Sequence, residues 1–506
     1  MRSMNSRRSN RAASSPTQHR TVRLSVFRSW PSAALLIAAQ GALLFAATYW
    51  VAPDGSDSNS GTSSNAPFAT PQKAVTLSAL APGDTIYVRG GTYVLSTPVK
   101  PSKSGTAAIP IRLWAYPGEL PVFDFSPMPA SAGKALDVRR DYWHVRGIEV
   151  KNAPDNGIFV GGTGNIIEGC VAHDCGNDGF ALGSTSARAT NTLILNCDSY
   201  RNYAGGDGNN GDGFAAKAGC GPGNVFRGCR AWHNADDGWD FYYNTNHSVV
   251  LEYCWSFWNG YNLWGYTGTW NGNGNGFKLG GAGTQARHFL TNCVTFGNRR
   301  KGFDHNHSAG GQTIVHCIGY SNGTVNFSFY ETPTVGTNLL INNVSYLATA
   351  TSLDPTTIQI SNSWQGISVG DSDFASLDVS LALAPRNPDY SLASNALFRL
   401  APGSRLIDRG ALIGRPYSGN APDLGPFEFI PPPAGPLRLT SPVWSNAVFR
   451  FQIEGLSARG LIVIYGSSNL AAWTPLFTNP PATGTIQVLD PTAAGQPLRF
   501  YRAEER

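Results

Sequence analysis

An imperfect repeat between Asn156 and Lys301 constrains the fold more than any other feature of this 506-residue sequence. In each unit a polar residue precedes a Gly and then an apolar or aromatic residue. The polar residues are Asn156, Asp178, Asp212, Asp237, Asn275 and Lys301, and the residues two places after them are Ile158, Phe180, Phe214, Trp239, Phe277 and Phe303. The intervals are 22, 34, 25, 38 and 26 residues, as expected for one unit with loop insertions. Such a repeat predicts a solenoid in which each coil buries its apolar residues only against its neighbours.

Two further columns of residues keep step with this repeat. The first consists of cysteines and the second of asparagines five places later: Cys170, Cys197, Cys229, Cys254, Cys293 and Cys317, followed by Asn202, Asn234, Asn259, Asn298 and Asn322. Short β runs, Gly turns and Asn side chains that can satisfy backbone groups at each bend predict a parallel β-helix. We expect the cysteine column to be unpaired and to face the core. The pairing of Cys175 and Cys220, which stand outside it, is open.

The chain divides into four predicted segments. Residues 1–47 form a leader, 48–430 the β-helix domain, 431–436 a Pro-rich linker, and 437–506 a small β-sandwich of alternating apolar and polar residues. The leader is Arg-rich and then apolar over 15 residues, too short for a membrane span of about 20. It predicts a signal peptide cleaved after Ala47 and a secreted protein with no membrane segment in its mature form. A later start codon or an uncleaved anchor is the alternative.

The charge balance argues against nucleic acid as a partner. The formal net charge is +5, but residues 1–47 hold seven of the 38 Lys and Arg and none of the 33 Asp and Glu. The remainder therefore carries 31 basic and 33 acidic residues, about −2 net, and lacks a basic surface for a phosphate backbone. We expect a monomer.

Acidic residues gather where the repeat places them on adjacent coils. Equivalent residues of neighbouring coils lie about 4.8 Å apart, so Asp212 should lie beside Asp237, with Asp236 and Asp240 flanking it. Four carboxylates this close repel one another unless a cation balances them, and Ca²⁺ prefers six to eight oxygen ligands. An Asp-Gly step can also be a simple turn, which is the interpretation we adopt for Asp178.

Lys278 occupies the same place in its coil as Asp240, one residue after the apolar column. Alternation along a strand predicts that it points outward and is exposed. A surface ion pair with Asp240 or Asp304 would explain it without any function. If the substrate is a polyuronate, a neutral Lys278 could instead remove the proton on C5 while Ca²⁺ withdraws charge from the uronate carboxylate. The pKa of this lysine would have to fall for that role.

Other residues near this place could contact a glycan. An insertion before Asn275 is rich in aromatic residues, and its Trp264 and Trp270 could stack on sugar rings, although the loop could equally pack on itself. Cations that could meet an acidic chain are Lys217, Arg300 and Lys301. All five are candidate substrate-binding residues.

The motifs GDGFAAK, ADDGWD and NGNGFKLGG resemble those of polysaccharide lyase family 9, as do VAPDGSD, PGDTIYVRGGTY and RRKGFDHN. This resemblance covers residues from about 48 to 330 and implies a right-handed parallel β-helix that cleaves by β-elimination and leaves an unsaturated uronide. It implies that the primary calcium ligands are Asp212, Asp236, Asp237 and Asp240, and that Lys278 is the catalytic base. Tyr243 and Asn244 stand where the family pattern suggests a Thr-Lys pair. The substrate could therefore be polygalacturonate or rhamnogalacturonan.

Two alternatives stay open at this point. A glycoside hydrolase on the same fold would need a spaced pair of carboxylates and no calcium. A non-catalytic solenoid would bind glycans through calcium and release no unsaturated product.

Overall fold

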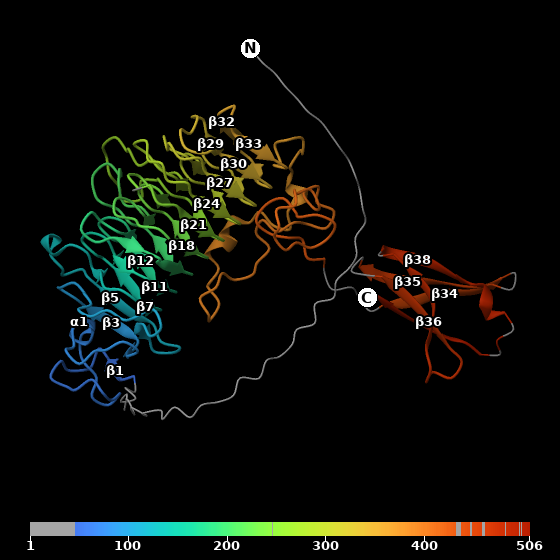
Figure 1. Ribbon diagram of the computed structural model, residues 1–506, viewed down its shortest axis with the longest axis horizontal. Helices are drawn as coiled ribbons and strands as arrows, with labels where there is room; N and C mark the ends of the chain where they lie inside the picture. Colours follow the sequence, from blue (N-terminus) through green and yellow to red (C-terminus); the bar gives the residue numbers. More distant parts are fainter. Residues whose placement is uncertain are drawn as a thin grey trace, which may run out of the picture. The chain divides into compact units, whose positions relative to one another are not determined.

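The computed structural model describes residues 46–244, 246–431, 437–445, 448–457, 461–480, 482–494, 496 and 498–505 (Figure 1). The predicted leader lies outside these ranges except for its last two residues, and so do residues 432–436 of the predicted linker. Among the described residues, no helix is both long enough and apolar enough to cross a membrane.

Three parallel sheets form the walls of the β-helix, and each coil from β6 to β31 contributes one strand to each sheet, whereas the coils at the two ends lack one or two of the three strands (Figure 1). Sheet A comprises β1 (Thr48–Val51), β2 (Thr85–Val88), β4 (Ile111–Ala115), β7 (Trp143–Arg146), β11 (Ile166–Glu168), β15 (Leu193–Leu195), β18 (Asn224–Arg227), β21 (Val249–Glu252), β24 (Phe289–Thr291), β27 (Thr313–Val315), β30 (Leu339–Ile341) and β33 (Ile358–Ile360). Sheet B comprises β3 (Gly91–Val94), β5 (Pro121–Asp124), β8 (Glu149–Lys151), β12 (Val171–His173), β16 (Asp198–Tyr200), β19 (Arg230–Trp232), β22 (Trp255–Phe257), β25 (Val294–Phe296), β28 (Ile318–Tyr320) and β31 (Val344–Tyr346). Sheet C comprises β6 (Leu136–Val138), β9 (Ile158–Val160), β13 (Phe180–Leu182), β17 (Phe214–Ala215), β20 (Trp239–Asp240), β23 (Phe277–Lys278), β26 (Phe303–Asp304), β29 (Val325–Phe329) and β32 (Thr349–Leu353).

The aromatic column of the repeat forms the inner face of sheet C. Phe214 pairs with Trp239 and Trp239 with Phe277 in the strand register. Their rings stack with centroids 4.6 and 4.8 Å apart and are fully buried. This register confirms the predicted alignment of the coils, and with it the parallel β-helix.

The cysteine and asparagine columns also lie where the repeat predicts them. All eight cysteines are free and buried, including Cys175 and Cys220. At the bend after sheet B, the side-chain oxygen of each Asn accepts the backbone N–H of the equivalent residue one coil earlier. Asn259 accepts from Asn234 (3.1 Å) and Asn298 from Asn259 (3.1 Å), and the ladder starts where Asn202 accepts from Cys175 (3.2 Å). This ladder satisfies buried backbone groups where strand pairing is interrupted.

Short helices and a two-stranded sheet complete the β-helix. Helix α1 (Pro71–Val75) begins after Thr70, whose side chain accepts the N–H of Lys73, and it buries Ala74 and Val75 at the start of the stack. The other elements are β10 (Gly162–Thr163) paired with β14 (Ala189–Thr190), and the 3₁₀ helices η1 (Ala130–Ala132), η2 (Asp371–Asp373) and η3 (Val379–Leu383).

The segment from Asp371 to Ile430 packs against the side of the β-helix, on sheet B. Its apolar residues, among them Phe398 and Leu406, pack on the outward face of sheet B against Phe257 and Phe296. The outward face of sheet B carries apolar residues such as Trp255 and Val294, so this face has to be covered. Arg230 and Arg386 fix the segment through Asp198, which the two guanidinium groups approach to 2.8 and 2.7 Å.

The C-terminal module is a small antiparallel β-sandwich. One sheet contains β34 (Arg438–Ser445), β35 (Val448–Ser457) and β38 (Thr483–Asp490), and the other β37 (Thr474–Asn479), β36 (Ile462–Ser467) and β39 (Phe500–Glu505). The 3₁₀ helix η4 (Pro491–Ala493) follows β38. Phe451, Ile453, Ile462 and Ile464 form the core between the two sheets. This arrangement confirms the predicted fold of the module.

Candidate active site

The turn residues that open the strands of sheet C form a hydrogen-bonded ladder. A carboxylate oxygen of Asp212 accepts the N–H of Asp237 at 2.9 Å, and Oδ1 of Asp237 accepts the N–H of Asn275 at 2.7 Å. The Gly that follows each of them is required by space, since a Cβ on Gly238 would lie 2.7 Å from the carbonyl oxygen of Gly276. One carboxylate oxygen of each Asp thus holds two coils in register, and the other oxygen can contact a cation or a substrate.

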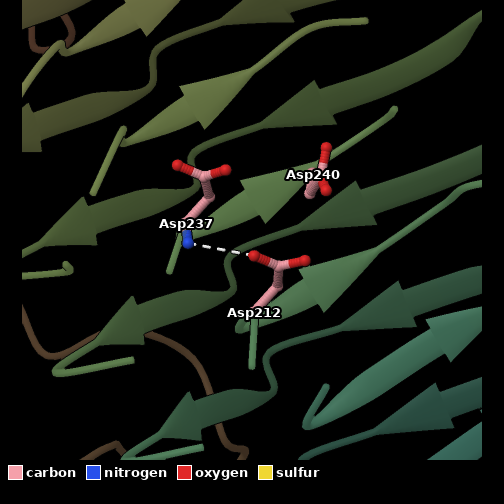
Figure 2. Close-up of side chains that lie close together, drawn as sticks. All are labelled: Asp212, Asp237 and Asp240. Carbon is pink, nitrogen blue, oxygen red and sulfur yellow. Dashed lines mark hydrogen bonds between the residues drawn. The ribbon is translucent and has the colours of Figure 1, made fainter. Parts of the chain in front are cut away.

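Three carboxylates meet on the outer side of sheet C. Each of Asp212, Asp237 and Asp240 offers an oxygen within 4.8 Å of the others, and all three residues are buried (Figure 2). We call them the acidic triad. Asp236 is also buried, but it lies outside this group, and its Oδ1 accepts the N–H of Asn273 from the next coil. The structure therefore brings together three of the four predicted metal ligands.

Two lysines enter the acidic triad from opposite sides. Nζ of Lys217 lies 2.7 Å from Asp212 and 3.1 Å from Asp240, and Nζ of Lys278 lies 3.0 Å from Asp237 and 3.5 Å from Asp240. Lys278 points away from the core as predicted, because Phe277 before it and Leu279 after it are core residues. The expectation that Lys278 is exposed was wrong.

Only 7% of the surface of Lys278 is accessible. Its neighbours on the outer face cover it, since the triad surrounds its amine and the ring of Tyr242 lies 5.5 Å from Nζ. Tyr242 follows Asp240 in the loop after β20, and its N–H donates to Asp240 Oδ1 at 2.8 Å. Alternation along a strand predicts which side chains point outward, but it does not predict whether a loop covers them.

Burial and charge shift the pKa values of these groups in opposite directions. Burial raises the pKa of Asp212 well above its usual value and also raises that of Asp237. Burial acts the same way on Asp240, but Lys217 and Lys278 outweigh it and its pKa is lowered. For Lys278, burial lowers the pKa, yet attraction to Asp237 and Asp240 prevails and the pKa lies above its ordinary value.

The donor set suits a hard divalent cation. The triad supplies only carboxylate oxygens, which Ca²⁺ prefers. Oδ2 of Asp237 is fully buried and has no hydrogen-bond partner, because Lys278 approaches it at ion-pair distance without hydrogen-bond geometry. Together with Asp178 and Asp236 the cluster holds five buried carboxylates against two amines, an excess of negative charge that a cation would reduce.

Of the two predicted substrate-binding cations that lie beyond Lys278 in the chain, one is engaged elsewhere and one is free to meet a substrate. Lys301 pairs with Asp304 at 3.1 Å, with its Nζ 5.0 Å from the ring of Tyr330. Arg300 is exposed. Neither of these cations is among the main influences on the pKa of Lys278.

The aromatic insertion packs partly on itself. Trp264 stacks on Tyr203 with centroids 4.6 Å apart, and the rings of Trp264 and Trp270 lie 6.1 Å apart. Nε1 of Trp270 donates to the carbonyl oxygen of Gly260, so this side chain holds the loop. Trp264 and Tyr203 also line a cavity of about 540 Å³ beside Arg201. The end of the loop reaches the site, where Asn273 contacts Asp236.

Asp178 is a part of the site that sequence reasoning set aside. Its Oδ1 lies 3.8 Å from Nζ of Lys217 and accepts the N–H of Asp212, and the residue is buried. Its position in the same turn column as Asp212, one coil earlier, was the signal that could have found it.

Comparison with known proteins identifies the family. A family model described as Pel9A-like, right handed beta helix region matches residues 49–343, more than half of the chain. A protein named pectate lyase L of Dickeya dadantii is 40% identical over 75% of this chain and 90% of its own length. The chain belongs to polysaccharide lyase family 9. It is therefore a polysaccharide lyase. This result argues against both alternatives, the glycoside hydrolase and the non-catalytic solenoid.

Solved structures agree with this family membership. The crystal structure of pectate lyase Pel9A matches with a TM-score of 0.70 and 38% identity, and the match covers 75% of this chain and 96% of Pel9A. A structure titled rhamnogalacturonan lyase has a TM-score of 0.62 and 29% identity, covering 70% of this chain and 96% of that one. The chain thus resembles solved lyases named for two different pectic substrates.

Proposed function

We propose that this family 9 lyase is secreted and cleaves an acidic polysaccharide, pectate first of all, by calcium-dependent β-elimination with Lys278 as the base. The observation that carries the proposal is the amine of Lys278, which lies 3.0 Å from Asp237 and 3.5 Å from Asp240 in a buried carboxylate cluster. The relatives named pectate lyase in Dickeya dadantii and in Emericella nidulans, at 40% and 33% identity, support pectate as the substrate.

The acidic triad would hold the cation, with Asp236 close by as a fourth carboxylate. Bound there, Ca²⁺ would supply the positive charge that withdraws electrons from a uronate carboxylate and acidifies the proton on C5. Asp237 and Asp240 keep the proton on Lys278 as long as their charge is unbalanced. Asp236 and Asp212 act in the same direction, so the cation would have to balance the charge of the whole cluster before burial, which lowers the pKa of Lys278, prevails.

A neutral Lys278 would then take the proton from C5 of the uronate. The electron pair of that C–H bond forms the double bond between C4 and C5, and the bond from C4 to the glycosidic oxygen breaks. Its electron pair stays on that oxygen, which takes a proton from solvent and leaves as the hydroxyl of the neighbouring sugar. Tyr242 and the triad exclude water from the amine, since Lys278 is 7% exposed. The product that carries the new double bond absorbs in the ultraviolet.

The remaining parts of the proposal concern the chain as a whole. Residues 1–47 would be a leader that is removed, residues 48–430 would carry the activity, and residues 431–436 would connect this domain to the C-terminal module. The protein would act as a monomer and would not bind nucleic acid. The family match over residues 49–343 supports the second of these points. Rhamnogalacturonan is the second candidate substrate, favoured by the similarity to the rhamnogalacturonan lyase structure.

A substrate panel tests the proposal. Mature protein is incubated with polygalacturonate, rhamnogalacturonan or alginate, in Ca²⁺ or in EDTA, and the ultraviolet absorbance of the unsaturated uronide is followed. We expect growth on polygalacturonate that EDTA abolishes. Growth on rhamnogalacturonan alone would move the assignment to that substrate, and equal rates in EDTA would remove calcium from it.

A further inference from the structure

Lys217 lies inside the acidic triad, on the side away from Lys278. Its Nζ is 2.7 Å from Oδ2 of Asp212 and 3.1 Å from Oδ2 of Asp240. These oxygens belong to two of the residues that would hold a metal ion. An ammonium group and a divalent cation cannot both lie between the same two carboxylates without strong repulsion.

A third carboxylate lies within reach of the same amine. Oδ1 of Asp178, on the coil before Asp212, is 3.8 Å from Nζ of Lys217. Asp178 is buried and held in place, because it accepts hydrogen bonds from the backbone N–H of Asp212 at 3.2 Å and from the side-chain Nδ2–H of Asn156 at 3.1 Å. Lys217 is the more adjustable partner, with a flexible four-carbon stem and 29% of its side chain accessible.

We infer that Lys217 is the internal counter-ion of the acidic triad, an inference that rests on the proposed calcium site. It balances Asp212 and Asp240 in the metal-free chain, and it moves toward Asp178 when a divalent cation binds. Lys217 therefore competes with the metal and weakens its binding, while Asp178 receives the displaced amine and favours binding. In exchange, the metal-free cluster avoids buried carboxylates with no partner, which are strongly destabilising.

The test compares Lys217→Met, Asp178→Asn and the wild type by Ca²⁺ titration calorimetry and by thermal unfolding in EDTA. Lys217→Met should tighten the Kd for Ca²⁺ by about tenfold or more and lower the unfolding midpoint in EDTA by at least about 3 °C. Asp178→Asn keeps an oxygen for the N–H of Asp212 and should weaken Ca²⁺ binding by at least about threefold. Lys301→Met, which removes a comparable amine paired with Asp304 on the same sheet, should leave the Kd unchanged.

Unchanged Ca²⁺ affinity in both Lys217→Met and Asp178→Asn would overturn the inference while leaving the proposed calcium site intact. If Lys217→Met does not fold in EDTA, its unfolding in saturating Ca²⁺ should still match the wild type, and Asp178→Asn decides the point alone. A wild type that binds no Ca²⁺ but forms unsaturated product would instead overturn the calcium assignment, and the counter-ion role with it.

Discussion

Nζ of Lys278 lies 3.0 Å from Oδ2 of Asp237, a fully buried carboxylate oxygen with no hydrogen-bond partner. The other oxygen of Asp237 accepts the N–H of Asn275 and so belongs to the ladder that sets the register of sheet C. One side chain therefore joins the backbone of the solenoid to the amine of the proposed base. Catalytic geometry and coil stacking are set by the same residue.

Asp237→Asn separates these two duties. The amide oxygen of Asn can still accept the N–H of Asn275, so the register should survive, but one charge of the triad is lost. We expect Ca²⁺ affinity to fall by at least about 100-fold, with a midpoint of unfolding in EDTA equal to or above that of the wild type. Calorimetry and thermal unfolding measure both. Asp304→Asn, one coil beyond Lys278 in the same outward column, is the matched control and should bind Ca²⁺ normally.

The asparagine ladder should carry a large share of the stability at its bend. Asn259 is fully buried, accepts the N–H of Asn234 and donates to Oδ1 of Asn298 at 2.9 Å. Asn259→Ala leaves these groups without partners and should lower the free energy of unfolding by about 3 kcal/mol. Denaturant unfolding measures the loss. The exposed Asn65→Ala should change stability by less than about 0.5 kcal/mol, and a similar small effect for Asn259→Ala would contradict the role of the ladder.

How far the sequence predicts this molecule depends on which contacts are periodic. The pairing of Phe214 with Trp239 follows from a repeat in which every coil restates the same pattern, and so do the buried cysteines. The covering of sheet B does not repeat. Arg230 donates to the carbonyl oxygen of Ala382, 152 residues later, and no periodicity signals such a contact.

In the site, too, the contacts that follow the repeat were predictable and those made by loops were not. Asp212, Asp237 and Asp240 come together because strand register stacks them, whereas the burial of Lys278 depends on the ring of Tyr242 from a loop. Asp236 is also buried next to Asp237, but the N–H of Asn273, which one of its oxygens accepts, comes from an insertion that the repeat does not predict.

His288 should make the β-helix sensitive to acid. It is fully buried beneath the ring of Phe241, Nδ1 accepts the N–H of Val249, and burial lowers its pKa to about 3. A folded-state pKa below the unfolded value of about 6.5 means that its contribution to stability is complete above that pH. The contribution is lost as the pH falls toward the folded-state pKa, by an amount on the order of 4 kcal/mol.

His288→Gln removes this titration and keeps an acceptor for Val249. Gln312 occupies the same place one coil later, where its Oε1 accepts the N–H of His288, so the exchange fits the ladder. Between pH 6.5 and 4 the free energy of unfolding should fall less steeply in His288→Gln than in the wild type. Urea unfolding at several pH values measures the slopes. Equal slopes would show that His288 is not the titrating group.

Trp264 and Trp270 should affect the enzyme differently. Trp264 lines the cavity with Tyr203 and Arg201, so Trp264→Ala should raise KM about fivefold or more with little change in kcat if sugars stack there. Trp270 holds the carbonyl oxygen of Gly260, so Trp270→Ala should loosen the loop and lower kcat as well. Steady-state kinetics on polygalacturonate distinguishes them, and wild-type KM for Trp264→Ala would exclude its ring from substrate contact.

The most direct test of the account is product formation by Lys278→Ala in saturating Ca²⁺. Calorimetry on the same sample shows whether the metal still binds, since the triad is unchanged. We expect Ca²⁺ binding at least as tight as in the wild type and a rate of unsaturated uronide formation reduced by at least about 1,000-fold. Normal turnover by Lys278→Ala with Ca²⁺ bound would contradict the assignment of Lys278 as the base.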